Sequence, residues 1–206
     1  MKLLGLILMF IARAIYRSDV KDFCRLLTDV YNGERKRPID GLPEHLVQCL
    51  IIAEDRRFYR HRGVDFFSFA RAIWLFITRG QTIRGVSTIE QQLVRIITGR
   101  REPTVRRKWK EVLLASTVQD LLPKSEIPSF YLSVAYFGWR MNGIRDACKR
   151  KEWRISEISE SQAASLIARL KYPEPRMPSH QRSALISMRA DYILAQYNEQ
   201  KRKRAK

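Results

Sequence analysis

The residues best suited to chemistry lie in the segment EDRRFYRHRGVD, which begins at Glu54. On a helix Glu54, Phe58 and His61 recur at intervals of four and three residues, so a carboxylate, an aromatic ring and an imidazole share one face. The preceding run, LVQCLIIA, is almost wholly apolar and predicts that Glu54 ends a buried helix. Desolvation there suits a general base or acid. The alternative is a helix end whose charges lie in solvent.

A second polar segment, RGVSTIEQQLVR, runs from Arg84 to Arg95. Ser87 could cap the helix that follows, because a hydroxyl accepts hydrogen bonds from the free N–H groups of a helix start. The adjacent amides of Gln91 and Gln92 have no comparable structural explanation. These amides are therefore the candidate functional part of the segment.

A third segment, TVRRKWKEVLLA, places Arg107 and Glu111 four residues apart, with Lys108 and Lys110 beside them. Such a pair is usually a surface salt bridge worth a few tenths of a kcal/mol. Several cations around one carboxylate also suit a diphosphate, since arginine offers a fork of donors and lysine a point charge. Spacing leaves both interpretations open.

Helices must position these segments, because apolar residues recur at intervals of three and four from Pro43 onward, as at Leu46 and Leu50. No sustained alternation of apolar and polar residues predicts a large sheet. Residues 17–42 are mixed and polar, and turns are predicted at Asn32-Gly33 and between Pro38 and Pro43. We therefore predict a linker over residues 17–42.

The N-terminal segment is the most apolar part of the chain. A helix from Leu3 to Tyr16 would span about 21 Å, which is less than the hydrocarbon core of roughly 30 Å. The segment fits a signal-like sequence or a short anchor whose Arg13 reaches the headgroups. A buried core helix is the alternative.

The composition excludes several classes of protein. With 45% hydrophobic residues the chain can bury a core, which argues against intrinsic disorder. The three cysteines, Cys24, Cys49 and Cys148, have neither a disulfide pattern nor metal-ligand spacing. There are 39 Lys and Arg against 21 Asp and Glu, and the net charge of +18 should attract nucleic acid, anionic lipid or a polyanionic substrate.

Five segments, in this order, resemble the motifs of the peptidoglycan glycosyltransferases, the transglycosylase domain of penicillin-binding proteins and of monofunctional biosynthetic transglycosylases. The resemblance covers about residues 40–195, and it favours the monofunctional type. The chain departs from the family pattern at Val86, Glu90, Pro103, Ser133 and Arg140. The five segments are EDRRFYRHRGVD from Glu54, GVSTIEQQL from Gly85, RKWKE from Arg107, KSEIPSFYLSVAYFG from Lys124 and RADYIL from Arg189.

The resemblance implies a mainly α fold, a lysozyme-like helical domain with a short N-terminal membrane segment. The expected domains are an anchor or signal-like segment (1–16), the linker (17–42), the glycosyltransferase domain (43–197) and a basic tail (198–206). The run from Ile73 to Ile77 is a candidate membrane-contacting surface, with a core helix as the alternative.

The resemblance also implies a reaction, the polymerisation of lipid II into β-1,4-linked glycan with release of undecaprenyl diphosphate. Glu54 would be the general base, and Glu111 would be the second catalytic carboxylate, orienting the cations or the sugar. The substrate-binding residues implied in the same way are Asp55, Phe58, His61, Ser87, Thr88, Gln91, Gln92, Arg95, Arg107, Lys108 and Lys110.

No cofactor or metal is required by this reaction, because cationic side chains can carry the diphosphate, although a divalent cation is compatible with it. The implied partners are lipid II, the growing glycan strand, membrane lipids and cell-wall synthesis proteins, without nucleic acid. The implied location is the bacterial inner membrane, with the catalytic domain on its periplasmic or outer face. The alternatives are an inactive relative that acts as a cell-wall scaffold, a glycan-cleaving enzyme and a basic nucleic-acid-binding protein.

Overall fold

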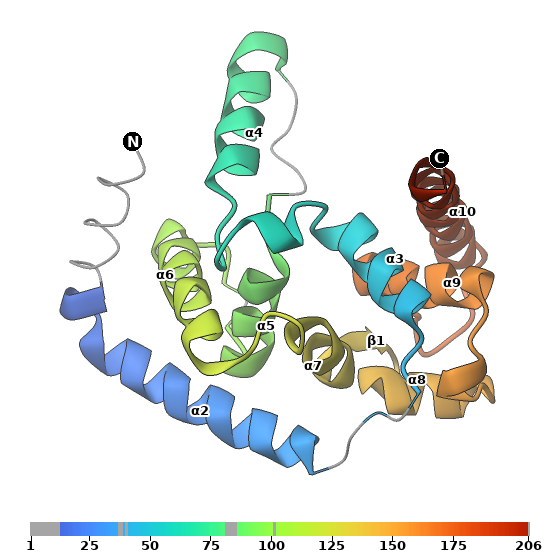
Figure 1. Cartoon of the computed structure of the whole chain (residues 1–206), viewed down its shortest axis with the longest axis horizontal. Helices are drawn as coiled ribbons and strands as arrows, with labels where there is room; N and C mark the ends of the chain where they lie inside the picture. Colours follow the sequence, from blue (N-terminus) through green and yellow to red (C-terminus); the bar gives the residue numbers. More distant parts are fainter. Residues whose placement is uncertain (1–12, 37–38, 40, 81–85, 101, 206) are drawn as a thin grey trace. The chain divides into compact units, whose positions relative to one another are not determined.

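The computed structural model describes residues 13–36, 39, 41–80, 86–100 and 102–205, without the side chain of Ile73. The described residues are mostly helical, and the only sheet among them has two strands, which confirms the prediction of a mainly α fold (Figure 1). They form two compact units. Unit 1 contains the described residues up to Lys36 and Arg57–Ile127, and unit 2 contains those from Ile39 to Arg56 and from Pro128 onward.

Unit 1 is built from helices whose apolar faces pack together, and its core includes Phe23, Leu27, Leu93 and Leu113. The side chains of Asp65, Thr88 and Thr104 accept backbone N–H groups at the start of three of these helices. The elements of unit 1 are α2 (Arg17–Arg35), η1 (Phe58–Arg60), α4 (Phe66–Arg79), α5 (Ile89–Thr98) and α6 (Val105–Leu121).

The segment predicted to be a linker is the main difference from the sequence analysis. It contains α2, which packs on α5 and α6 through Phe23 and Leu27, so the linker prediction is wrong for Arg17–Arg35. Gly33 lies inside the helix rather than in a turn, because the buried residues of α2 fix its helical conformation. The predicted anchor lies outside the described residues except for positions 13–16. None of the described helices combines the length and the apolar character needed to cross a bilayer.

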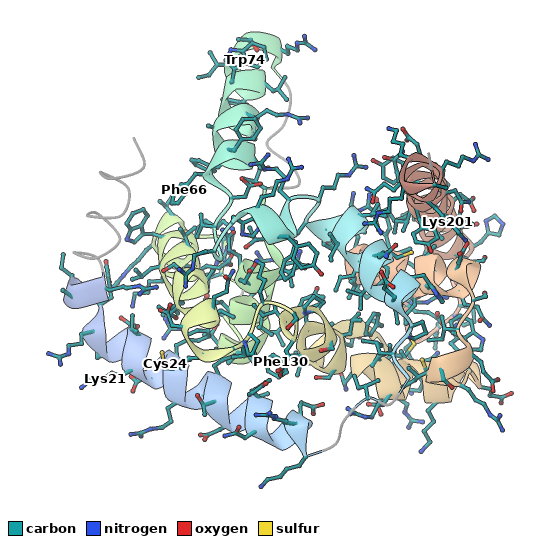
Figure 2. The ribbon with its side chains drawn as sticks, in the orientation of Figure 1. Lys21, Cys24, Phe66, Trp74, Phe130 and Lys201 are labelled. Atoms are coloured by element: carbon teal, nitrogen blue, oxygen red, sulfur yellow. The ribbon has the colours of Figure 1, made fainter. Side chains whose placement is uncertain are left out.

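Helix α4 carries aromatic side chains that remain exposed (Figure 2). Phe66 and Phe67 lie at its start, and Trp74, Phe76 and Ile77 lie near its end, each more than half exposed. A core helix would bury them, so that alternative is wrong for the described side chains. A membrane-contacting role for this helix stays a prediction.

Unit 2 packs helices α3, α9 and α10 together, burying Leu46, Leu50, Leu166 and Ile193. The hairpin β1–β2 is antiparallel, and it is extended by a parallel bridge between Gly138 and the loop that follows α9. The elements of unit 2 are α3 (Glu44–Glu54), α7 (Ile127–Val134, with Ile127 in unit 1), β1 (Tyr136–Gly138), β2 (Met141–Asn142), α8 (Gly143–Lys151), η2 (Ile155–Glu157), α9 (Glu160–Lys171) and α10 (His180–Arg204).

Candidate active site

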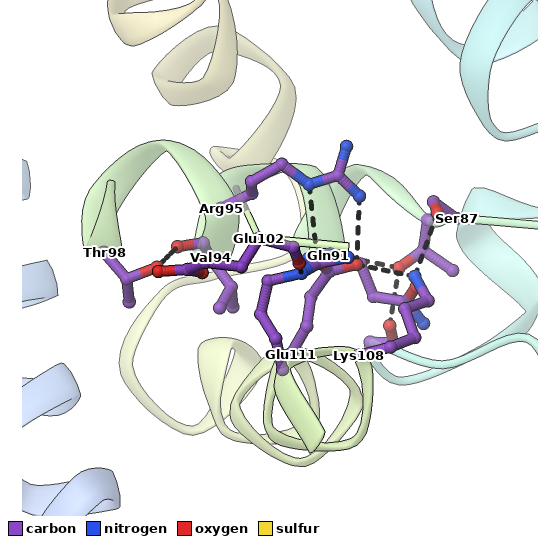
Figure 3. A network of polar contacts seen from close by, with 11 residues as sticks. Ser87, Gln91, Val94, Arg95, Thr98, Glu102, Lys108 and Glu111 are labelled. Carbon is purple, nitrogen blue, oxygen red and sulfur yellow. Dashed lines mark hydrogen bonds and ion pairs between the residues drawn. The ribbon is translucent and has the colours of Figure 1, made fainter. Parts of the chain in front are cut away.

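A buried carboxylate in unit 1, that of Glu111, is surrounded by three cations (Figure 3). Arg95 of α5 donates Nε to Oε2 and Nη2 to Oε1, both at 3.2 Å. Lys108 Nζ lies 2.6 Å from Oε1, and Arg107 Nη1 also donates to Oε2. We call these four residues the Glu111 cluster. The Arg107–Glu111 pair expected from the spacing is therefore formed, but as part of a buried cluster rather than as an isolated surface salt bridge.

Helices α5 and α6 supply the residues of this cluster, and a capping threonine fixes where each helix begins. Thr88 caps α5 by accepting the N–H of Gln91, and it donates to the carbonyl of Gly63 at 2.6 Å. Thr104 caps α6 by accepting the N–H of Arg107. The cap of α5 is thus Thr88 and not Ser87, the residue for which the sequence suggested that role.

Ser87 and Gln91 instead extend the Glu111 cluster through Lys108. Lys108 Nζ lies 2.7 Å from Gln91 Oε1 and 3.0 Å from Ser87 Oγ, so one ammonium group joins both polar segments (Figure 3). Gln92, the second amide, is half-buried on α5. The structure therefore brings Ser87, Gln91 and the cluster together, and their role in substrate binding stays a prediction.

The electrostatics of the cluster favour a charged Glu111. Burial raises the pKa of this carboxyl, but hydrogen bonds from Arg95 and Lys108 and the charges of both cations outweigh burial, and the net pKa is lowered. Glu111 is therefore charged at neutral pH, where it forms ion pairs with three cations. Arg95 and Lys108 remain more than a third exposed, which leaves them accessible to an anionic ligand.

Lys110 is not part of the cluster, although it lies between Lys108 and Glu111 in the sequence. Its Nζ lies 2.8 Å from both carboxylate oxygens of Asp19 on α2 and 5.2 Å from the centre of the Tyr16 ring. Residues two apart on a helix point in nearly opposite directions. The structure thus assigns Lys110 an ion pair with α2, although it lines the same small pocket as Arg95 and Arg107.

A second polar group in unit 1 was missed as a site by the sequence analysis. Glu90 is fully buried, and Lys124 Nζ lies 2.5 Å from its Oε1 and 3.7 Å from the centre of the Phe58 ring. Lys124 and Gln119 also donate to the carbonyl of His61. Lys124, paired with the buried Glu90, therefore contacts both predicted residues, Phe58 and His61. Lys124 begins the fourth motif, and this was the feature of the sequence that could have indicated the ion pair.

The other predicted catalytic carboxylate, Glu54, belongs to unit 2. It is the last residue of α3, as the apolar run indicated, and its side chain is 16% exposed. Arg189 of α10 donates Nη2 to the carbonyl of Ala53 at 2.8 Å and lies 3.8 Å from Glu54 Oε1. The fifth motif thus places a guanidinium beside the carboxylate of the first. Asp55 follows as the buried C-terminal cap of α3.

A family model described as Transglycosylase matches residues 25–198, which is most of the chain. The chain therefore belongs to the transglycosylase family, and its resemblance to the transglycosylase domain of penicillin-binding proteins is confirmed. The monofunctional type stays a prediction.

Among curated relatives, the chain is 32% identical to penicillin-binding protein 1A of Haemophilus influenzae, over 80% of this chain and 19% of that protein. It is 31% identical to penicillin-binding protein 1A of Rickettsia felis, over 90% of this chain and 23% of that protein. The protein of the same name from Escherichia coli is 40% identical over 58% of this chain and 14% of its own length. The chain thus spans about a fifth of the length of these relatives.

Proposed function

We propose that this chain is a peptidoglycan glycosyltransferase that polymerises lipid II into β-1,4-linked glycan and releases undecaprenyl diphosphate. The observation that carries the proposal is the Glu111 cluster, in which a buried anion pairs with two cations of the third motif and with Arg95, just beyond the second. Family membership supports the same reaction class. The expected location is the outer face of the bacterial inner membrane.

In the proposed reaction the 4-hydroxyl of an acceptor sugar attacks the anomeric carbon of the growing strand. A new C–O bond forms, the bond to the diphosphate breaks, and the configuration at the anomeric carbon is inverted. Glu54 takes the hydroxyl proton as general base, a role that contributes typically 10²–10⁴-fold. Arg189 Nη2 lies 3.8 Å from Glu54 Oε1.

The Glu111 cluster meets the negative charge that develops on the leaving diphosphate. Arg95, Arg107 and Lys108 supply fixed positive charge before the reaction begins, and such preorganised electrostatics are among the strongest catalytic effects. The side chains of these residues already carry donors suited to phosphate oxygens. The proposal therefore requires no metal ion, and Glu111 acts as a positioning residue and not as the base.

The test is to incubate the purified chain with labelled lipid II in detergent and to follow glycan polymer. Glu54→Gln should lower the rate by about 100-fold or more, because an amide cannot accept the proton. The matched control is Glu44→Gln, an exposed carboxylate in the first turn of the same helix, which should leave the rate within about twofold.

Three outcomes would contradict the proposal. Polymer formation unchanged by Glu54→Gln would remove Glu54 from the chemistry. Absence of polymer from the folded wild-type chain would favour the scaffold alternative. Shortening of a preformed glycan, with no elongation, would indicate a glycan-cleaving enzyme.

A further inference from the structure

Unit 2 contains a cavity of about 390 Å³ that none of the predicted site residues lines. Its walls come from the end of α8, one face of α9, the loop 174–179 and the first turns of α10. Cavities that bind small ligands begin at about 300 Å³. This one therefore has room for a ligand of that class.

The chemistry of the lining is cationic and rich in hydroxyls. Four cations face two carboxylates, Glu174 and Asp191, so positive charge is in excess. Serine hydroxyls donate hydrogen bonds to phosphate oxygens as readily as they accept them. The cations of the lining are Arg150, Lys151, Arg169 and Arg176, and its hydroxyls belong to Ser161, Ser165, Ser179, Ser183 and Ser187.

Glu174 holds three of these cations in place. Arg169 Nε and Lys151 Nζ each lie 2.7 Å from its Oε2, and Arg150 Nη2 lies 3.8 Å from Oε1. We call these four residues the Glu174 cluster. The Arg169 side chain is only 10% exposed, and its Nη1 donates to the carbonyl and the hydroxyl of Ser165. Arg169 is thus fixed within unit 2, while Arg150 and Lys151 are about a quarter exposed and are held by their ion pairs with Glu174.

Trp139 fixes the outer cations of the cavity. The guanidinium carbon of Arg150 lies 5.0 Å, and that of Arg176 5.6 Å, from the centre of the indole ring. Arg150 also donates to the Trp139 carbonyl. Guanidinium groups held on an aromatic face keep their edge N–H groups available to oxyanions.

The backbone fixes Glu174 itself. Its N–H donates to the Phe137 carbonyl at 3.0 Å and its carbonyl accepts the N–H of Trp139 at 2.9 Å, which joins the loop to the hairpin. Gly138 allows this approach, because a Cβ at that position would lie 2.5 Å from the Glu174 backbone. The cluster is therefore preorganised, so ligand binding pays little for ordering it.

We propose that this cavity binds the phosphate group of a small phosphate-bearing ligand, at a site separate from the Glu111 cluster. Arginine forks and serine hydroxyls together match the several acceptor oxygens of a phosphate. The volume leaves room beside the phosphate for a group of about the size of a sugar. The same chemistry would serve a soluble sugar phosphate or the phosphodiester of a lipid headgroup.

The test is residue-resolved NMR on the full chain, titrated separately with inorganic phosphate and with a hexose phosphate. The NMR signals of the Trp139 indole N–H and of the Ser179 and Ser183 backbone amides should shift with ligand concentration along the same saturation curve. Residue-resolved signals separate this site from the Glu111 cluster, which could also bind phosphate. Vesicles of phosphatidylglycerol, compared with phosphatidylcholine, form a second arm that distinguishes a lipid source from a soluble one.

Two variants probe the cavity without breaking the Glu174 cluster. Arg176→Ala removes a cation that contacts the Trp139 ring. Ser183→Asp adds a negative charge to the exposed first turns of α10. Each should weaken phosphate binding about tenfold, since a charge-assisted hydrogen bond is lost or opposed. Arg182→Ala removes the same charge from the position next to Ser183, outside the cavity lining, and should change binding less than twofold.

Several results would overturn the proposal. If the NMR signals of the cavity residues do not shift, or if Arg176→Ala and Arg182→Ala lower phosphate affinity equally, phosphate is attracted only by diffuse positive charge. Acetate or citrate binding as tightly as phosphate would refute the ligand class. Binding of hexose phosphate or of phosphatidylglycerol vesicles, sensitive to Arg176→Ala, would support it and identify the source. None of these results depends on polymerisation of lipid II, so the proposed function and this site can fail independently.

Discussion

The Glu111 cluster of unit 1 and the Glu174 cluster of unit 2 have the same composition. Each surrounds one glutamate with three cations, and in each the pKa of that carboxyl is raised by burial but lowered overall by hydrogen bonds and charges from its partners. The hydrogen bonds that lower the pKa come from Arg95 and Lys108 around Glu111, and from Lys151 and Arg169 around Glu174. Composition alone therefore does not tell the two clusters apart.

Their construction differs. The Glu111 carboxylate is 2% exposed and held between two regular helices, whereas that of Glu174 is 21% exposed and lies on a loop joined to a hairpin. A pocket that Glu111 lines together with Arg95 and Arg107 has a volume of about 10 Å³, enough for one water molecule at most. The space beside Glu174 is about 390 Å³.

The difference teaches that similar charge clusters present their cations in different ways. In the Glu111 cluster Arg95 and Lys108 are more than a third exposed, so they can meet the proposed diphosphate from the solvent side. In the Glu174 cluster they line a cavity, as suits a ligand small enough to enter it. Arg107, Lys108 and Glu111 of the first cluster lie in the third of the five motifs, and no residue of the second cluster lies in any of the five.

The largest expected contrast is in activity. Lys108→Ala should lower the rate of lipid II polymerisation by about 100-fold, since a fixed charge that stabilises the leaving group is lost. The same change at Lys151 should lower the rate by less than tenfold. The measurement is polymer formation by each variant at matched concentration of folded protein. Equal losses in the two variants would erase the functional distinction between the clusters.

The next contrast is in stability. Glu111→Gln removes the anion from a buried site with three cations and should cost about 2–3 kcal/mol. Glu174→Gln removes a more exposed anion and should cost only about 1 kcal/mol. Urea unfolding of both variants at pH 7 checks the order. A larger loss for Glu174→Gln would show that its loop, and not burial of its charge, governs the stability of unit 2.

The pH dependence sharpens the same comparison. Because the folded-state pKa of each glutamate lies below its ordinary value of about 4.3, each contributes stability above that value and loses it as pH falls through the folded-state pKa. The stability difference between wild type and Glu111→Gln should therefore be full at pH 7 and shrink steadily below about pH 4. A difference that stays constant down to pH 2 would mean that shape, and not charge, distinguishes Gln from Glu at this position.

The sequence predicted those parts of the fold and site that depend on local periodicity. The helical class and the Arg107–Glu111 pair follow from spacings of three and four residues, and the position of Glu54 follows from the apolar run before it. The expected helix face shared by Glu54, Phe58 and His61 is wrong, because α3 ends at Glu54 and Phe58 lies in η1. Helix α2 was missed because its many charges and Gly33 hide a short apolar stripe, in which Phe23 and Leu27 are buried four residues apart.

Features that depend on long-range packing could not be predicted in this way. Lys110 faces α2 because α2 packs on α6. The sequence analysis predicted a linker where α2 lies, so this contact was not expected. The Glu174 cluster joins the end of α8, α9 and the following loop, and none of the five motifs contains those residues. Its discovery required the cavity, a property of the folded unit rather than of any one segment.

The smallest expected contrast concerns the helix caps that support the two clusters. Thr88 caps α5 with a buried hydroxyl that also donates to Gly63, whereas Ser179 caps α10 with a half-buried hydroxyl at 3.3 Å from the N–H of Arg182. Thr88→Ala should cost about 1.5 kcal/mol, because it loses the cap and leaves a buried carbonyl without its donor. Ser179→Ala should cost about 0.5–1 kcal/mol, since water can replace an exposed cap.

Thermal unfolding of the two alanine variants measures this difference, and Thr88→Ser provides the matched control. Serine keeps the hydroxyl and loses only a methyl group, so it should recover most of the stability lost in Thr88→Ala. If Thr88→Ser is as unstable as Thr88→Ala, packing of the methyl group rather than the hydrogen bonds of Thr88 holds the start of α5. In that case the register of the Glu111 cluster depends on the apolar core of unit 1, and the contrast with the backbone-fixed Glu174 cluster becomes larger.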